Sequence, residues 1–191
     1  GRVTGMEQQD ILSMTLPELQ AAVQELGEPK FRAKQIFNWL HQKRVTDFSE
    51  MTTLSLPFRE RLASDFCINR LKIAKRLASS VDDTVKYLYE LPDGNYVETV
   101  CMQYHHGTSL CISTQVGCRM GCRFCASAIA GFVRNLTPAE MLLQIYETER
   151  AQNCKISSLV LMGIGEPLDN FDNVLRFLQL LSDPNGYGMS L

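Results

Sequence analysis

The chain has 191 residues, of which 45% are hydrophobic and 21% are charged, so it can form one large or two small globular domains. No apolar run approaches the ~20 residues that a membrane-spanning helix needs, and the first five residues lack the apolar core of a secretory signal. We therefore expect no membrane span, and reduced, metal-binding cysteines together with the lack of an export signal predict a cytoplasmic location.

The formal net charge of −2 is unevenly distributed along the chain. Residues 30–76 contain eleven Lys and Arg against four Asp and Glu, whereas residues from 81 onward contain seven basic and twelve acidic residues. Such a division favours a basic module that contacts a polyanion, although solvated charged faces also produce it. We expect two domains: a basic, helical accessory domain over residues 1–80, which would contact the polyanion, and a second domain over residues 81–191.

Short helices separated by breakers are predicted in the first 76 residues, over 16–26, 31–40 and 57–65. The second of these places apolar residues near helical spacing and leaves basic residues for its other face. Small helical units with basic faces often bind nucleic acids. The aromatic residues Phe31, Phe37 and Trp39 are expected to serve mainly in the core.

From residue 81 the pattern changes to strands. Residues 85–91 and 96–102 alternate and flank a turn at 92–95, which predicts a hairpin, and 108–114 is the next strand. A helix is predicted over 137–152 from the capping box of Thr137 and Glu140, followed by a strand at 157–162. The last predicted helix, 172–182, has one apolar face made of Val174, Leu175, Leu178 and Leu181.

The order of these elements predicts an α/β fold with a parallel sheet and helices outside it. Two βα units cannot close a barrel or bury both faces of a parallel sheet. We therefore expect the first part of a TIM-like barrel, in an N-terminal portion of a longer protein.

Three cysteines lie within eight residues, at Cys118, Cys122 and Cys125. Three thiolates leave one iron of a [4Fe-4S] cluster without a protein ligand, and an open iron can bind a small molecule. A structural zinc site is the alternative, and it would need a fourth ligand. The candidates for that ligand are Cys111, Cys154, His105 and His106. A disulfide is disfavoured because Cys122 and Cys125 are too close to close a stabilising loop and the cysteine count is odd.

Three further positions are candidates for chemistry. Cys111 shares a strand face with Ser109 and Ser113, so it is expected to face an active-site lumen, although a lone buried cysteine is usually inert. The segment Gly165-Glu166-Pro167 follows the next strand, at the end where α/β proteins bind ligands, but such turns are common. Glu98 has apolar neighbours on its strand face, which would raise its pKa and suit a general base, unless it is an exposed edge residue.

The cysteine motif after one strand and Gly165-Glu166-Pro167 after another resemble the radical SAM superfamily. More specifically, the chain resembles the RlmN-type RNA adenine-C2 methyltransferases, which are related to the antibiotic-resistance Cfr enzymes. The segments that carry this resemblance are 31–35, 97–100, 110–118, 131–137 and 162–168, and it extends over nearly the whole chain.

The resemblance implies roles for single residues. Cys118, Cys122 and Cys125 would hold a [4Fe-4S] cluster, while Gly165 and Glu166 would bind S-adenosyl-L-methionine. Glu98 would be the proton acceptor at adenine C2. Cys111 would resolve the enzyme–RNA crosslink through a transient disulfide.

The resemblance also implies substrates and partners. The activity would be methylation of adenosine C2 in 23S rRNA at the peptidyl-transferase centre and in the tRNA anticodon loop. A cysteine beyond this chain would carry the methyl group, so the 191 residues alone are expected to be inactive. A flavodoxin-like one-electron donor and a monomeric state are expected. The alternatives are a radical SAM enzyme with a non-RNA substrate and a non-catalytic, zinc-dependent RNA-binding protein.

Overall fold

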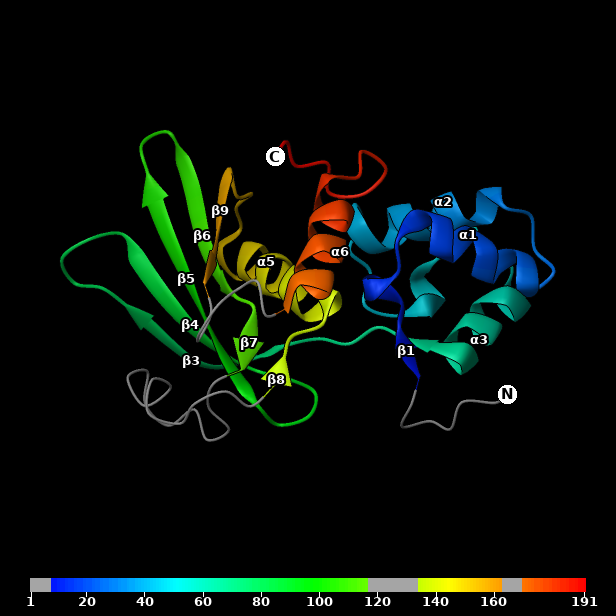
Figure 1. Cartoon of the computed structure of the whole chain (residues 1–191), viewed down its shortest axis with the longest axis horizontal. Helices are drawn as coiled ribbons and strands as arrows, with labels where there is room; N and C mark the ends of the chain where they lie inside the picture. Colours follow the sequence, from blue (N-terminus) through cyan, green and yellow to red (C-terminus); the bar gives the residue numbers. More distant parts are fainter. Residues whose placement is uncertain (1–7, 117–133, 163–169) are drawn as a thin grey trace. The chain divides into compact units, whose positions relative to one another are not determined.

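The computed structural model describes residues 8–116, 134–162 and 170–191, which form two compact units. The first unit contains the chain up to Asn69 together with Leu175–Leu191, and the second contains Arg70–Val174. Figure 1 shows helices in the first unit and a sheet with a covering helix in the second. None of the helices in these ranges is long and apolar enough to cross a membrane.

Three helices build most of the first unit: α1 (Leu16–Glu25), α2 (Phe31–His41) and α3 (Leu56–Asp65). The first begins at a capping box, in which Thr15 and Glu18 satisfy backbone groups at the helix start. Two two-residue strands, β1 (Gln9–Asp10) before the helices and β2 (Phe66–Cys67) after them, pair with each other in parallel. The three predicted helices are confirmed to within one residue at every end.

Apolar side chains of these helices meet in one core. Leu19, Val23, Ile36, Phe37 and Leu62 are fully buried, which follows from their helical spacing. Phe37 is thus a core residue as expected. The expectation for Phe31 is wrong, because its side chain is 55% exposed and lies beside the Arg32 guanidinium, 4.8 Å from the ring centre.

The end of the chain packs into this same core. The boundary between the two units falls within α6 (Phe171–Ser182), and beyond it Gly186 lies so close to Phe37 that a Cβ there would be 2.8 Å from the ring. Arg44 lies over the ring of Tyr187, and Gln42 donates to the Gly186 carbonyl oxygen. The second compact unit, Arg70–Val174, therefore begins earlier and ends earlier than the second domain expected over residues 81–191.

A five-stranded sheet forms the second unit, in the order β3-β4-β5-β6-β9. Its strands are β3 (Lys72–Ala78), β4 (Thr84–Glu90), β5 (Tyr96–Tyr104), β6 (Gly107–Ser113) and β9 (Ser158–Met162). The first four pair antiparallel and β6 pairs with β9 in parallel. The hairpin turns at Gly94, whose φ of +86° favours glycine.

Helix α5 (Pro138–Gln152) covers one face of the sheet, as Figure 1 shows. Its side chains bond to Thr99, Tyr89 and Tyr87, which lie on that face. The chain thus runs from β6 through α5 to the parallel β9, which confirms the predicted α/β fold with a βα unit. We call the other face, which carries Lys86, Glu98 and Cys111, the open face.

Two details differ from the sequence-based expectation. Strand β3 was expected within the helical basic module, yet it pairs with β4 along its length. On α6 the buried residues are Phe177, Leu180 and Leu181, whereas Leu175 is 45% exposed. The predicted apolar face of that helix is therefore wrong by about one residue of rotation.

Candidate active site

The carboxyl ends of β6 and β9 lie side by side because these strands pair in parallel, with Ser113 opposite Met162. The chain leaves β6 toward residues 117–133 and leaves β9 toward residues 163–169. Cys118, Cys122, Cys125, Gly165 and Glu166 fall in those segments and lie outside the described residues. Both candidate binding segments therefore begin near the carboxyl ends of these two strands, which is where α/β folds bind their ligands.

Short strands on either side of the cysteine segment join its two ends. Strand β7 (Gln115–Val116) pairs antiparallel with β8 (Arg134–Asn135), and the Gln115 amide donates to Asn135 Oδ1 at 3.1 Å. Arg134 then bonds Glu140 through two nitrogens, at 2.8 and 2.7 Å, and Asp93 at 2.8 Å. These contacts fix the points at which the chain enters and leaves the cysteine segment.

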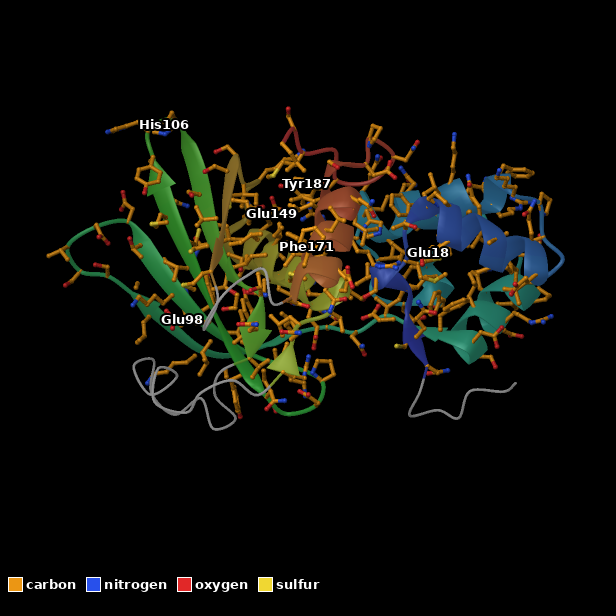
Figure 2. All side chains as sticks on the ribbon, viewed as in Figure 1. Glu18, Glu98, His106, Glu149, Phe171 and Tyr187 are labelled. Carbon is orange, nitrogen blue, oxygen red and sulfur yellow. The ribbon has the colours of Figure 1, made fainter. Side chains whose placement is uncertain are left out.

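Glu98 and Cys111 come from neighbouring strands and share the open face. Val100 pairs with Cys111, so continuation of this register places Glu98 diagonally across from the cysteine. Leu110 and Ile112, on either side of Cys111, are fully buried on the opposite face. This arrangement confirms the predicted alternation, in which Cys111 faces away from the apolar layer. Figure 2 shows Glu98 on the sheet, far from His106 at the other end of the strands.

Burial is the main influence on both groups. It raises the pKa of the Glu98 carboxyl above its usual range, and the nearby Lys86 ammonium acts in the opposite direction. Burial also raises the pKa of the Cys111 thiol, and the Glu98 charge adds to that effect. The two groups are therefore close enough to influence each other electrostatically. A carboxylate held partly out of water can accept a proton near neutral pH.

Lys86 is a site residue that the sequence analysis did not single out. Its Nζ lies 3.9 Å from Glu98 Oε1, across the β4–β5 pair. A signal was available, since the predicted hairpin places Lys86 opposite Val100 and hence on the face of Glu98. A lysine in an exposed strand is otherwise an ordinary surface residue, and only the pairing register distinguishes it.

Of the four candidate fourth ligands for zinc, Cys111 lies near this edge and the other three do not. His105 and His106 lie in the turn between β5 and β6, so the seven-residue strand β6 separates them from the entry to the cysteine segment. Cys154 interacts with Thr108, near that same far end. Among the described residues no three His, Cys, Asp or Glu side chains form a group that could hold a metal.

The described cysteines are all free thiols: Cys67, Cys101, Cys111 and Cys154. Cys101 is buried on the helix-covered face of β5, and burial raises its pKa to about 11. Cys67 lies in β2 of the other unit. Of these four, only Cys111 is on the open face with Glu98.

Comparison with known proteins gives concordant results. Residues 9–68 match a family model described as the ribosomal RNA large subunit methyltransferase N-terminal domain. Over 187 residues the chain is 51% identical to a probable dual-specificity RNA methyltransferase RlmN of Lachnoclostridium phytofermentans, covering 96% of this chain and 52% of that protein. A protein of the same description from Alkaliphilus oremlandii is 51% identical over 181 residues, with 95% and 52% covered.

A solved structure agrees with the fold. The crystal structure of a radical SAM methyltransferase from Sphaerobacter thermophilus matches with a TM-score of 0.81 and 33% identity. The match covers 95% of this chain and 54% of that one. The chain therefore spans about half the length of the proteins that it matches.

Proposed function

We propose that this chain, which belongs to the RlmN-type RNA methyltransferases over the half of those proteins that it spans, is part of an enzyme that methylates C2 of adenosine. Its substrates would be 23S rRNA at the peptidyl-transferase centre and the anticodon loop of tRNA. The observation that carries this proposal is the 51% identity over 187 residues to a dual-specificity RNA methyltransferase.

Cys118, Cys122 and Cys125 would hold a [4Fe-4S] cluster, and Gly165 and Glu166 would bind S-adenosyl-L-methionine. The donor set fits, because three thiolates suit a cubane that keeps one iron open. The adjacent ends of β6 and β9 support it further, since both segments start at one edge of the sheet. When bound, the cluster and S-adenosyl-L-methionine would supply radical chemistry. Methylation of adenine C2 requires it, because an aromatic carbon between two nitrogens is a poor nucleophile.

Glu98 would take the proton from adenine C2 once the new carbon is attached. Its support is geometric and electrostatic: the carboxyl is half-buried on the open face, and burial raises its pKa. A base of this kind must be ionised before it acts, and the Lys86 ammonium at 3.9 Å favours that form.

Cys111 would release the product. The cysteine that carries the methyl group belongs to the part of the enzyme outside this chain, and it would be joined to C2 through a thioether. The Cys111 thiolate would attack that sulfur, so that an S–S bond forms as the S–C bond breaks. The electron pair stays on carbon, which takes up a proton to become the methyl group. The free, half-exposed Cys111 thiol beside Glu98 supports this role.

The helical N-terminal unit would contact RNA. Exposed cations next to aromatic rings support this role, as in Lys43, whose Nζ lies 3.9 Å from the Trp39 ring centre. Binding should weaken as salt is raised. We infer in addition a flavodoxin-like electron donor, a monomeric state and a cytoplasmic location, where the RNA substrates are.

The direct test uses a full-length enzyme that contains this chain, reconstituted without air and given labelled S-adenosyl-L-methionine. The expected product is 2-methyladenosine in 23S rRNA and tRNA, identified by mass spectrometry of digested RNA. Methyl transfer to neither RNA, with the cofactor still cleaved, would instead favour a radical SAM enzyme with another substrate. Binding of RNA without any cofactor cleavage would favour the non-catalytic alternative.

A further inference from the structure

Helix α5 carries a polar side chain, Gln144, at a position that is completely buried. Its Oε1 accepts from Thr99 Oγ1 at 2.8 Å and from the Ser113 backbone N–H at 2.9 Å. Its Nε2 donates to the Ser113 carbonyl oxygen at 2.9 Å and to the Glu140 carbonyl oxygen at 3.3 Å. The full hydrogen-bonding capacity of the amide is therefore used, as a buried amide requires.

The partners of Gln144 are adjacent to the two candidate chemical groups. Thr99 directly follows Glu98 on β5, and Ser113 comes two residues after Cys111 on β6. The β5–β6 pairing ends at Val100 and Cys111, although continuing the register would pair Glu98 with Ser113. The regular pairing of the two strands therefore ends two residues before the end of β6, just before the chain enters the cysteine segment.

Side chains replace the missing backbone pairing at this level. Gln144 binds both the N–H and the C=O of Ser113, and the Ser113 hydroxyl donates to the Glu98 carbonyl oxygen at 2.6 Å. The Glu98 carboxylate has a weak restraint of its own, namely Lys86 at 3.9 Å, with both side chains partly exposed. The direction of Glu98 is thus set mainly by the backbone, which this hydrogen-bond network holds.

We propose that Gln144 is a positioning residue, which fixes the backbone of β5 and β6 so that Glu98 reaches the C2 proton and Cys111 reaches the thioether sulfur of the same adduct. This inference rests on the proposed function for its catalytic consequence. Gln144 lies on the opposite side of the sheet from both groups and does not touch the substrate. It acts through Thr99 and Ser113.

The same helix offers a matched control one turn later. Thr148 is also fully buried, and its hydroxyl forms a 2.7 Å hydrogen bond with the Tyr89 hydroxyl of β4. Thr148→Val removes one buried hydrogen bond between α5 and the sheet without involving Glu98, Cys111 or their strand ends. A general loosening of α5 would therefore appear in this variant as well.

The experiment compares Gln144→Met with Thr148→Val in a full-length enzyme that contains this chain. In single-turnover reactions with RNA, Gln144→Met should slow product release about tenfold or more, and a covalent protein–RNA species should accumulate. Thr148→Val should release product at the wild-type rate even where its melting temperature falls equally. If both variants slow release in proportion to their loss of melting temperature, Gln144 is only a structural amide.

Thr99 provides a milder pair in case Gln144→Met does not fold. Thr99→Val removes the hydroxyl that donates to Gln144, whereas Thr99→Ser keeps it. We expect Thr99→Val to accumulate the covalent species and Thr99→Ser to behave like the wild type. Equal behaviour of the two Thr99 variants would overturn the proposal.

A second readout does not depend on RNA chemistry. Alkylation of Cys111 by iodoacetamide, followed by mass spectrometry across a pH range, reports how the thiol sits beside Glu98. The Glu98 charge helps to raise the pKa of the Cys111 thiol, and Gln144→Met should loosen the placement of Glu98 beside it. Cys111 should therefore react several-fold faster and from a lower pH in Gln144→Met, but not in Thr148→Val. If the wild type fails to methylate RNA, the proposed function is wrong, and this profile still decides the positioning role. Identical profiles in wild type and Gln144→Met would contradict it.

Discussion

Glu98 and Cys111 differ in the step to which each would contribute, although they lie diagonally across one strand pair. The carboxyl would act on the C2 proton and the thiol on the thioether sulfur. Loss of either should leave the enzyme joined to RNA, but at different stages. Their separate roles can therefore be distinguished by the isotope that remains at C2.

We predict that Glu98→Gln and Cys111→Ala both lower product yield about a hundredfold or more in a full-length enzyme. With RNA deuterated at adenine C2, the adduct of Glu98→Gln should retain the deuterium, because no base removes it. The adduct of Cys111→Ala should have lost it. Intact-mass measurement of the adducts gives the answer, and wild-type yield in either variant would refute the role of that residue.

The charge of Lys86 should affect the pH dependence of the reaction. Burial raises the pKa of Glu98 and Lys86 lowers it, while Cys111 on β6 is the other titratable neighbour on this face. Because the ionised carboxylate is the active form, the rate should fall as the pH drops through this pKa. In Lys86→Met the pKa rises further, so the acid limb should move to higher pH.

The matched control for that change is Lys86→Arg, which keeps the positive charge. Its acid limb should remain near that of the wild type. Single-turnover rates over a pH series would measure both limbs. A Lys86→Met profile that coincides with the wild type would show that the ammonium does not act on Glu98.

At the scale of elements, Arg134 joins β8 to the start of α5 and to the β4–β5 turn. Its planar guanidinium meets both oxygens of the buried Glu140 carboxylate and also binds Asp93. A lysine cannot reproduce this geometry. We predict that Arg134→Lys lowers the free energy of unfolding by about 1–3 kcal/mol, and Arg134→Met by more, because Glu140 then loses its charged partner.

Urea unfolding would measure these changes. A fitting control is Arg61→Lys, since Arg61 and Asp65 form an exposed pair at 3.8 Å that should contribute little. Equal effects of Arg61→Lys and Arg134→Lys would contradict the assignment of a special role to Arg134.

Helix α2 contains a buried imidazole that should make the stability depend on pH. Burial lowers the pKa of His41 to about 3, with a contribution from Arg44. The unfolded chain takes up a proton on this residue below a pH of about 6.5, whereas the folded chain does not until a much lower pH. The contribution of His41 to the free energy of unfolding is therefore fully present above pH 6.5. It is lost progressively as the pH falls below that value.

The slope expected from His41 alone is up to ~1.4 kcal/mol per pH unit below pH 6.5. His41→Leu should remove this component, so that the wild type loses about 2 kcal/mol more than the variant between pH 6.5 and 5. Denaturant titrations at the two pH values would measure it. Parallel losses in both proteins would show that His41 is not the titrating group.

Elements with strong local signals are predictable from this sequence. The capping box of Thr137 and Glu140 marks the start of α5, and the Gly94 turn marks the hairpin. Strand β3 is not predictable in the same way, because all seven of its residues are exposed and its sequence is basic. Its assignment depends on pairing with β4, a tertiary contact that composition does not contain.

The candidate site was likewise predictable only in part. Alternation along the strands predicts that Cys111 and Glu98 avoid the apolar face, because that face is marked by Leu110 and Ile112. Lys86 and Gln144 were missed, because each acquires its importance from a neighbour distant in sequence. In the sequence Gln144 is one polar residue among others on a helix. Its importance comes from the four hydrogen bonds that its amide forms with β5, β6 and α5.

At the scale of the whole molecule, the charge division and the structural division do not coincide. Arg70, Lys72, Lys75 and Arg76 belong to the sheet unit, although they lie in the basic stretch that was expected to form one helical module. Leu175–Leu191 belongs to the helical unit, although it follows the acidic part of the chain. Chain order alone does not reveal that the end of the chain returns to α2.

The proposed chemistry depends on three cysteines that leave one iron of a cubane free for S-adenosyl-L-methionine. Reconstitution without air of a full-length enzyme that contains this chain tests that claim most directly. We predict about four irons per chain and an electron paramagnetic resonance signal of the reduced cluster that changes when S-adenosyl-L-methionine is added. A colourless protein with one zinc ion, or a cluster whose signal is unaffected by the cofactor, would contradict it.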